Sequence, residues 1–386
     1  MIYLDSAATT LQKPSAVARR TAAAMGSCGS VGRGGHPAAM AAADAVYQCR
    51  ELAGRLFEAE PEQVAFTMNA THGLNIAVKS LVSPGGSVVI SGFEHNAVVR
   101  PLYALGAQVQ IAGRRLFDPE DTLAQFERLL TPEVQAVFCT CVSNVFGYIL
   151  PYPQIAALCR ERGIPLVLDA SQAAGTLPLS LKTSGAAFIA MPGHKGLYGP
   201  QGTGLLLCSG GAEPLIQGGT GSRSADREMP EFLPDRLEAG THNVCGIAGL
   251  AEGLRFVLRR TPEAIFAHEV HLLRRMQEAL KPMGGIHVFS GRPQSGVLSF
   301  RMETLDCEEA AQQLGKRGIA VRAGLHCAPC AHESAGTFAT GTVRVSFSAF
   351  NTAAEIDRFA AVCREVFSGA GEKPRIPTCY CGRNRI

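Results

Sequence analysis

Short apolar stretches alternate with amphipathic stretches over the first half of the chain. Five stretches are brief and rich in branched or aromatic side chains, which is typical of buried strands: "QVAFT" (63–67), "SVVISG" (87–92), "AQVQIAG" (107–113), "VQAVFCTCVS" (134–143) and "IPLVLDAS" (164–171). Helical spacing of apolar residues occurs between them, in "HGLNIAVKSLV" (72–82), "HNAVVRPLYALG" (95–106) and "IAALCRERG" (155–163). This alternation predicts βα units and an α/β fold with a doubly wound, mostly parallel sheet.

The pattern changes towards the C-terminus. Residues 239–260 have the apolar spacing of a long connecting helix. Beyond them, two strand-like stretches flank a helix-like one within 285–350, which predicts a smaller α+β unit: "GVLSFRM" (296–302), "CEEAAQQLGKRG" (307–318) and "GTVRVSFS" (341–348). The last residues contain few apolar side chains and two prolines, so we expect a loosely held tail.

Composition and charge narrow the function classes. The 386 residues have a formal net charge of +3 and no run of five like charges, which argues against a nucleic-acid or membrane-binding face. No apolar run approaches the roughly 18 residues that span a bilayer, and "MIYLDSAATT" has no secretory pattern, so we expect a cytoplasmic protein. In that compartment the 13 cysteines would be reduced thiols rather than disulfides.

One lysine stands in a segment that is otherwise tight and uncharged. Lys195 follows the strand-like "AAFIAM" and precedes a glycine-rich loop, which places it where open α/β sheets bind their ligands. A partly desolvated lysine can lose its proton and condense with an aldehyde. A surface loop lysine is the plainer interpretation of Lys195 taken alone.

Companion residues favour a cofactor site. Asp169 ends another strand, where a buried carboxylate can pair with a pyridinium nitrogen. Ala70 and Thr71 begin a helix whose N–H groups could hold a phosphate. His95 ends a strand, and its ring could stack on an aromatic cofactor. Each has a structural alternative: a helix cap for Asp169 and Thr71, and a satisfied polar residue at a helix start for His95.

The order of motifs resembles a known family. The motifs are "LDSAATT", "NATHGLN", "EHNA", "SNVFG", "DASQAAG", "GHKGLYGPQGTG", "EAGTHN", "RAGLHCAP" and "GTVRVSFSAFNT". From residue 3 to about 365, the chain resembles the class V aminotransferase-fold enzymes, which use pyridoxal 5'-phosphate, and especially the cysteine desulfurase and selenocysteine lyase group. The resemblance implies fold type I and an active site at a homodimer interface. It implies a large cofactor-binding domain at 16–250, a small domain formed by 1–15 with 251–368, and a cysteine-containing tail at 369–386.

The resemblance also assigns roles to individual residues. Lys195 would form the Schiff base with the cofactor, Asp169 would pair with its ring nitrogen, Gln172 would bind its ring hydroxyl, and His95 would stack on the ring. The phosphate would be bound by Ala70, Thr71, His194 and, from the neighbouring subunit, Thr241. The substrate carboxylate would be bound by Asn144 and Arg344, with Arg322 nearby. His36 matches an active-site histidine of the family.

Cys327 decides the expected reaction. The family places a nucleophilic cysteine in this loop, which would take sulfur from L-cysteine as a persulfide and release L-alanine. An ordinary loop cysteine is the alternative for Cys327. Selenocysteine lyase, acting on L-selenocysteine, is the nearest alternative function. Another lyase, epimerase or transaminase on this fold, and a sulfur carrier or regulatory protein with a vestigial site, also stay open. A sulfur or selenium acceptor protein is a possible partner that no motif identifies.

Three features depart from the family pattern. Pro192 stands where many desulfurases have a phosphate-binding serine, and His72 stands where glutamate is common. Additional thiols occur at Cys330, Cys379 and Cys381. These three thiols and Cys327 would make four thiolates that could bind zinc or an iron–sulfur cluster. They could instead relay sulfur from Cys327, or be incidental reduced cysteines, which is the interpretation we adopt: we expect no metal.

Overall fold

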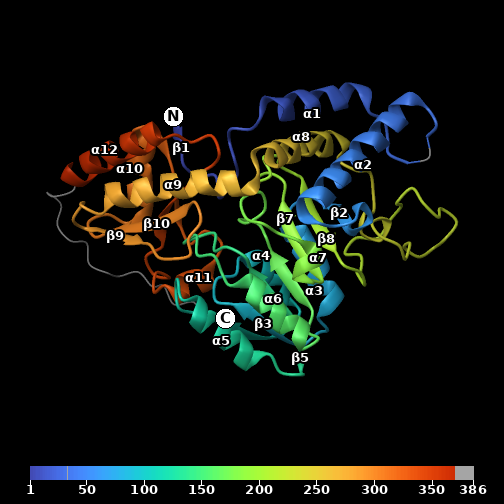
Figure 1. Ribbon diagram of the computed structural model, residues 1–386, viewed down its shortest axis with the longest axis horizontal. Helices are drawn as coiled ribbons and strands as arrows, with labels where there is room; N and C mark the ends of the chain where they lie inside the picture. The colour runs from blue at the N-terminus through green and yellow to red at the C-terminus, as the bar shows by residue number, and fades with distance from the viewer. Residues whose placement is uncertain (33, 370–386) are drawn as a thin grey trace.

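The computed structural model describes residues 1–32 and 34–369 and is built around a seven-stranded sheet (Figure 1). The strand order is β2-β8-β7-β6-β5-β3-β4. The five strands from β7 to β4 are parallel to one another, whereas β8 runs antiparallel to both of its neighbours. The strand bounds are β2 Val64–Thr67, β3 Ser87–Ser91, β4 Gln108–Ala112, β5 Val134–Thr140, β6 Leu166–Asp169, β7 Phe188–Pro192 and β8 Gly204–Cys208.

Helices cover both faces of this sheet. Side chains of Ala136 and Phe138 on β5 pack in one cluster with α3 and α4, whereas those of Val137 and Cys139 pack in another with α2, α5, α6 and α8. Alternate side chains of a strand point to opposite faces, so a strand buried on both faces is apolar throughout. The helices named are α2 Pro37–Phe57, α3 Ala70–Leu81, α4 Asn96–Ala104, α5 Pro119–Leu129, α6 Tyr152–Glu161 and α8 Val244–Arg260.

A second, antiparallel sheet has the order β12-β13-β10-β9, and a short parallel pair joins β1 to β11. Leu4, which follows β1, packs in the same core as Phe300 of β10 and Val343 of β13. The N-terminal strand therefore belongs spatially with the C-terminal part of the chain. The strand bounds are β1 Ile2–Tyr3, β9 Ile286–Phe289, β10 Val297–Met302, β11 Ile319–Ala320, β12 Arg322–Gly324 and β13 Thr342–Ser346.

Long helices connect these two parts. Helix α8 packs along α1 and α2, and α9 follows it after Thr261 and packs on α12 (Figure 1). The predicted domain division at residue 250 falls inside α8, and the division itself stays a prediction. The remaining helices are α1 Ser15–Ser27, α7 Leu181–Ser184, α9 Pro262–Leu280, α10 Cys307–Lys316, α11 Pro329–Ser334 and α12 Ala353–Gly369.

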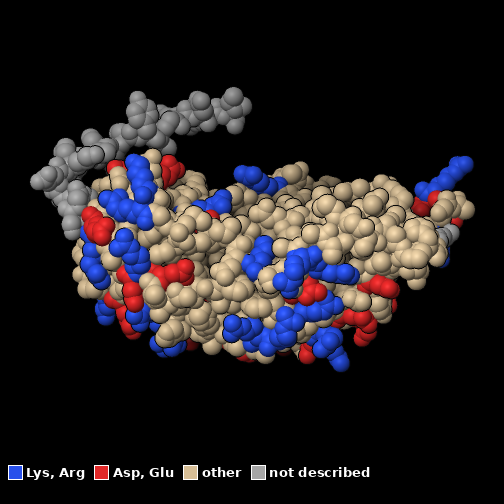
Figure 2. Space-filling view, turned by 90° about the horizontal axis from the view of Figure 1, so that it is seen from above, with Lys and Arg blue, Asp and Glu red and all other residues tan. Residues whose placement is uncertain are grey.

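The α/β architecture predicted from the sequence is confirmed, with β8 as the antiparallel exception. Acidic and basic side chains lie interspersed over the face that Figure 2 shows, rather than gathered by sign. Within residues 1–32 and 34–369, no helix combines the length and the apolarity that crossing a membrane requires.

Candidate active site

Lys195 lies in a closed loop directly after β7. The N–H of Gly199 donates to the carbonyl of Gly193 over 2.7 Å, and the N–H of Tyr198 donates to the carbonyl of Lys195 over 2.9 Å. Tyr198 itself has a positive φ of 55°. The loop presents Lys195 half-buried at the carboxyl end of the sheet, where burial lowers the pKa of its amine to about 8 and the negative charge of Asp169 partly opposes that change.

Asp169 is buried beside this loop because it ends β6, the parallel neighbour of β7. Its Cα is paired in register with that of Ala190. The Oδ1 atom accepts a hydrogen bond from the Ser171 N–H over 2.9 Å, while Oδ2 has no partner among the described residues. The charge of Asp169 acts on both Lys195 and His95. The structure thus brings together three residues that the sequence places on three separate strand ends.

His95 is the residue before α4, and its Nδ1 accepts a hydrogen bond from the Ala97 N–H over 3.0 Å. The ring is half-buried, and this burial lowers its pKa to about 4, so the imidazole is neutral at physiological pH. His95 is therefore a hydrogen-bonded polar residue at a helix start, which was the alternative interpretation of this residue from the sequence. The cap also fixes a neutral, flat ring next to Asp169 and Lys195.

Two sets of polar groups suit the phosphate of the expected cofactor. Helix α3 begins at Ala70, and the amides of Ala70 and Thr71 belong to its first turn, which has no intrahelical acceptors. Asn69 caps this helix through the N–H of His72. On the lysine loop, the Nδ1 atom of His194 is buried and has no hydrogen-bond partner. Free helix amides and an unpartnered imidazole nitrogen are groups that a phosphate satisfies, so the residues present fit pyridoxal 5'-phosphate.

Two residues near the expected phosphate site depart from the family pattern, and the structure shows their surroundings. Pro192 ends β7 opposite Gly204 and has no N–H to offer. His72 is half-buried, and burial lowers its pKa, so its ring carries no charge at neutral pH. Thr241 is exposed and lines a hollow of about 230 Å³ together with Met68 and His72.

Arg344 and Asn144 meet where β13 passes the loop after β5. The Nη1 atom of Arg344 donates to the backbone carbonyl of Asn144 over 3.0 Å, and Nη2 donates to Oδ1 of Asp5 over 2.7 Å. The Nε atom is buried without a partner. Arg322 lies opposite Arg344 in the β12–β13 register and is exposed. Two guanidinium groups, one with an unpaired N–H, are suited to bind a carboxylate.

Cys327 is exposed on a loop that contacts both strand ends. Its backbone carbonyl accepts a hydrogen bond from the N–H of Asn96, the residue after His95, over 2.8 Å. The carbonyl of His326 accepts one from the side-chain amide of Asn144, also over 2.8 Å. His326 and Cys327 have φ values of 51° and 56°. The backbone of Cys327 is therefore held at the start of α4, next to His95, and its thiol is exposed.

Two further predicted residues lie elsewhere. His36 is exposed, and its imidazole accepts a hydrogen bond from the N–H of Ala39 at the start of α2. Among the described residues, none of its contacts reaches Lys195 or the neighbours of Lys195, so the single chain does not bring His36 to the site. Cys330 is buried in α11, and burial raises the pKa of its thiol to about 11. Cys379 and Cys381 lie outside the described residues.

Three contacts around the site were not predicted from the sequence. They are the ion pair of Asp5, the stacked pair His326 and His332, and the hydrogen bond that holds the side chain of Gln172. Asp5 accepts a hydrogen bond from Arg344, which is far from it in sequence. The Nδ1 atom of His332 lies 2.7 Å from Oγ1 of Thr337, and the His332 ring stacks on that of His326 at a centroid distance of 5.7 Å. Gln172 donates through Nε2 to the backbone carbonyl of Ala7 over 2.9 Å. The motif "LDSAATT" was a signal for the N-terminal contacts, but no local pattern paired it with β13.

Comparison with known proteins agrees with this geometry. The family model described as Aminotransferase class-V matches residues 2–359. A probable cysteine desulfurase of Methanothermobacter thermautotrophicus is 31% identical over 385 residues, covering 95% of this chain and 94% of that protein. Probable cysteine desulfurase 1 of Mycobacterium leprae is 33% identical over 395 residues, and the match spans 96% of this chain but only 62% of that protein's length.

Solved structures of cysteine desulfurases are also similar to this chain. The apo structure of a cysteine desulfurase from Thermococcus onnurineus superposes with a TM-score of 0.89 at 28% identity, covering 95% of each chain. The cysteine desulfurase CsdA from Escherichia coli, in an S-sulfonic acid form, has a TM-score of 0.84 at 25% identity and covers 95% of this chain and 94% of its own.

Proposed function

The chain belongs to the aminotransferase class V family, and from that premise we propose that it is a pyridoxal 5'-phosphate-dependent cysteine desulfurase. It would convert L-cysteine to L-alanine and retain the sulfur as a persulfide on Cys327. The observation that carries this proposal is the pair of hydrogen bonds that hold the Cys327 loop against the start of α4 and the loop after β5. Those bonds support an active-site role for the exposed Cys327, because Asn96 directly follows His95, on which the charges of Asp169 and Lys195 act.

The cofactor would be held by groups that otherwise lack partners. Lys195 would bond its aldehyde, Asp169 its ring nitrogen and Gln172 its ring hydroxyl, with the neutral His95 ring against its face. Ala70, Thr71 and His194 would bind the phosphate. When bound, pyridoxal 5'-phosphate stabilises the negative charge that develops at the substrate Cα.

The chain's own residues would move the protons and the sulfur. The Nζ atom of Lys195, with a pKa near 8, is poised to take the Cα proton at physiological pH. Asp169 stays buried next to it and holds the site's negative charge. The Sγ atom of Cys327, as a thiolate, attacks the substrate sulfur. A new S–S bond forms, the carbon–sulfur bond breaks, and its electron pair stays with the carbon fragment, which gains a proton to become L-alanine.

Substrate orientation would come from β12 and β13. The Nε atom of Arg344 is buried and has no partner, and Arg322 lies opposite Arg344 in the register. Asn144 already donates its side-chain amide to the Cys327 loop. A carboxylate bound by Arg344 would therefore lie next to the same asparagine that positions the nucleophile.

A homodimer is part of the proposal. Thr241 is exposed in its hollow, and the exposed side chains of Met68 and Ile216 lie on the rim of the same hollow. Apolar side chains around a polar depression are typical of an interface. A second copy bound there would bring its Thr241 to the phosphate of the first copy. The exposed His36 would then lie at the active site of the neighbouring subunit. The acceptor protein, the cytoplasmic location and the domain division stay predictions.

The test is a product assay on purified, cofactor-loaded protein. L-Cysteine and L-selenocysteine are supplied separately, and alanine is measured together with sulfide or selenide. We expect turnover of L-cysteine that Cys327→Ala abolishes while the bound cofactor's visible absorbance persists, and that Lys195→Ala abolishes together with that absorbance. Turnover confined to L-selenocysteine would assign the chain to the lyases instead, and full L-cysteine turnover by Cys327→Ala would overturn the persulfide step.

A further inference from the structure

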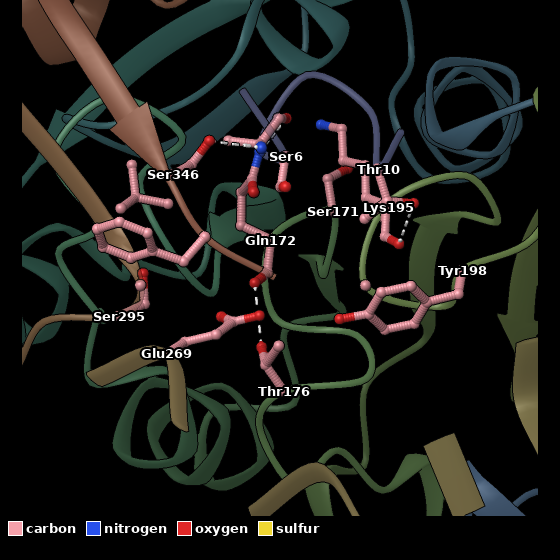
Figure 3. Close-up of a pocket in the computed structure, with 15 residues that line it drawn as sticks. Ser6, Thr10, Ser171, Gln172, Thr176, Lys195, Tyr198, Glu269, Ser295 and Ser346 are labelled. Carbon is pink, nitrogen blue, oxygen red and sulfur yellow. Dashed lines mark hydrogen bonds between the residues drawn. The ribbon is translucent and has the colours of Figure 1, made fainter. Parts of the chain in front are cut away.

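A small cavity adjoins the lysine loop, and Lys195 is among the residues that line it. It has a volume of about 30 Å³ and is lined by the turn after β6, the loop after β7, helix α9 and the residues before β10. Figure 3 shows the Nζ end of Lys195 pointing away from Glu269, which projects into this space from α9. The amine of Lys195 thus turns away from the carboxylate, although Lys195 and Gln172, two of the expected cofactor residues, both line the cavity.

Glu269 is the unusual member of the lining. Its side chain is 7% exposed, and it makes no hydrogen bond and no ion pair in the structure. Burial is the only cause that acts on its pKa, which rises to about 8, so no positive charge of the described residues faces it. A buried carboxyl group without a partner is costly, and such groups are found paired, protonated or bound to a metal ion.

Neutral oxygen atoms surround the carboxylate. The hydroxyls of Thr176 and Tyr198 point towards Glu269 in Figure 3. The hydroxyl of Ser295 lines the same cavity, is buried, and has no hydrogen-bond partner. The hydroxyl of Tyr198 accepts the Ala349 N–H over 2.9 Å and keeps a second lone pair. An unpartnered buried hydroxyl and an unpartnered buried carboxylate that share one cavity indicate that an occupant satisfies both.

Glycine at position 296 keeps this cavity open. A Cβ placed on Gly296 would lie 2.8 Å from Oε2 and 2.7 Å from Cβ of Glu269, closer than real side chains approach. Any other residue would push the carboxylate out of its place. The position of the Glu269 carboxylate therefore depends on a glycine at position 296.

Charge and size select the occupant. The described lining offers one carboxylate, several neutral oxygens and one basic residue, Lys195. Its Nζ points away from Glu269 in Figure 3, so the carboxylate is left to balance a single positive charge. Calcium and magnesium sites use more carboxylates or phosphate groups, and soft metals prefer sulfur or imidazole, which this cavity lacks among its lining residues. A volume of about 30 Å³ holds one or two bodies the size of a water molecule. These limits match a sodium or potassium ion with at most one water.

We propose that this cavity is a binding site for one monovalent alkali cation, with Glu269 as the charged ligand and the hydroxyls of Thr176, Tyr198 and Ser295 as neutral ligands. The ion joins α9 to the turns after β6 and β7. Because those turns support Asp169 and Lys195, the ion fixes the backbone on which the cofactor residues stand. This inference holds whatever amino acid the enzyme acts on.

The first experiment compares cations on the cofactor-loaded protein. Its melting temperature is measured in the chlorides of tetramethylammonium, lithium, sodium and potassium at equal ionic strength. A ligand that binds only the folded state raises the melting temperature, so we expect sodium or potassium to raise it by at least about 2 °C over tetramethylammonium. Equal melting temperatures in all four salts would mean a protonated carboxyl group beside water and would overturn the proposal.

A matched pair of variants locates the effect. Glu269→Gln should remove the difference between potassium and tetramethylammonium, whereas Glu278→Gln, an exposed position on the same helix, should keep it. Retention of the difference in Glu269→Gln would exclude this cavity as the site.

A direct measurement of ion binding to the wild-type protein tests the proposal even if Glu269→Gln does not fold. Thallium(I), a probe that replaces potassium, is titrated into wild-type holoenzyme and followed by thallium NMR. We expect one bound ion per chain that potassium displaces. A free-ion signal alone would contradict the proposal without bearing on the desulfurase reaction.

Discussion

The side-chain amide of Asn144 donates a hydrogen bond to the backbone carbonyl of His326 over 2.8 Å, and so holds the residue that precedes Cys327. The N–H of Asn96 holds the carbonyl of Cys327 itself over the same distance. Both His326 and Cys327 have positive φ values, which side chains other than glycine seldom adopt. Two hydrogen bonds, one from the first residue of α4 and one from the loop after β5, thus keep the cysteine loop in a conformation that is unfavourable by itself.

Asn144→Ala should loosen this loop while leaving the cofactor in place. Loss of one such hydrogen bond costs about 1 kcal/mol, roughly a fivefold change in the equilibrium between held and released loop. Amide hydrogen exchange of a peptide that contains Cys327 should become faster, and L-cysteine turnover should fall. Asn96→Ala is the matched control, because the hydrogen bond from residue 96 uses the backbone. Unchanged exchange in Asn144→Ala would show that the loop is held by other contacts.

The rate at which the apo-protein attaches pyridoxal 5'-phosphate should depend on the protonation of Lys195. Only the neutral amine attacks an aldehyde, and burial lowers the pKa of this amine to about 8. The attachment rate, followed by visible absorbance, should therefore rise with pH and level off above about pH 8. A rate that keeps rising towards the ordinary lysine value near 10.5 would show that the amine is not desolvated.

Glu94 should make the protein less stable as pH rises. Burial raises its pKa from 4.5 to about 8, so between these values the folded protein binds more protons than the unfolded chain. The free energy of unfolding consequently falls as pH increases over that interval. Glu94→Gln should flatten the fall, measured by urea unfolding at several pH values. An unaltered slope in Glu94→Gln would mean that Glu94 is ionised in the folded state.

The buried ion pair between Arg50 and Glu238 should be essential to stability. Glu238 binds the Arg50 guanidinium through both oxygens, accepts the Phe66 N–H over 2.6 Å, and lies 2.7 Å from Nε2 of His242. Removing one partner of a buried pair typically costs about 3–5 kcal/mol, because the other charge stays buried. Glu238→Ala should lower the free energy of unfolding by about that amount.

An exposed ion pair is the control for this prediction. Arg275 and Asp357 form two hydrogen bonds of 2.7 Å each in contact with solvent. Arg275→Ala should change the free energy of unfolding little, because solvent screens exposed pairs. Equal effects of Arg275→Ala and Glu238→Ala would show that burial does not set the strength of the inner pair.

Cys330 should not relay sulfur in the folded enzyme. It is buried, and its thiol pKa is raised to about 11, so it carries little thiolate at neutral pH. Mass spectrometry after brief iodoacetamide treatment should find Cys327 alkylated and Cys330 unmodified, and Cys330→Ser should retain sulfur transfer. Loss of transfer in Cys330→Ser, with turnover to alanine intact, would restore the relay role.

Much of the fold could be predicted because its signals are local. The strands that hold Asp169 and Lys195 are apolar throughout, since helices bury both faces of the sheet, and each is followed by a polar or glycine-rich turn. The long helices α1, α2 and α9 were missed. Their alanine-rich or charged surfaces resemble exposed chain when their packing against α8 and α12 is unknown.

The sequence by itself determined the order of the strands along the chain, the lysine and aspartate at two strand ends, and the cysteine in its loop. Those features depend on residue type and on neighbours close in sequence. Only the tertiary structure decided that Asp5 binds Arg344, that Asn144 holds the cysteine loop, and that Glu269 faces an oxygen-lined cavity. The first two contacts join residues that are 339 and 182 positions apart along the chain, and the cavity is lined by residues from Ser6 to Phe347. Their geometry follows from how the sheets pack, which no local pattern encodes.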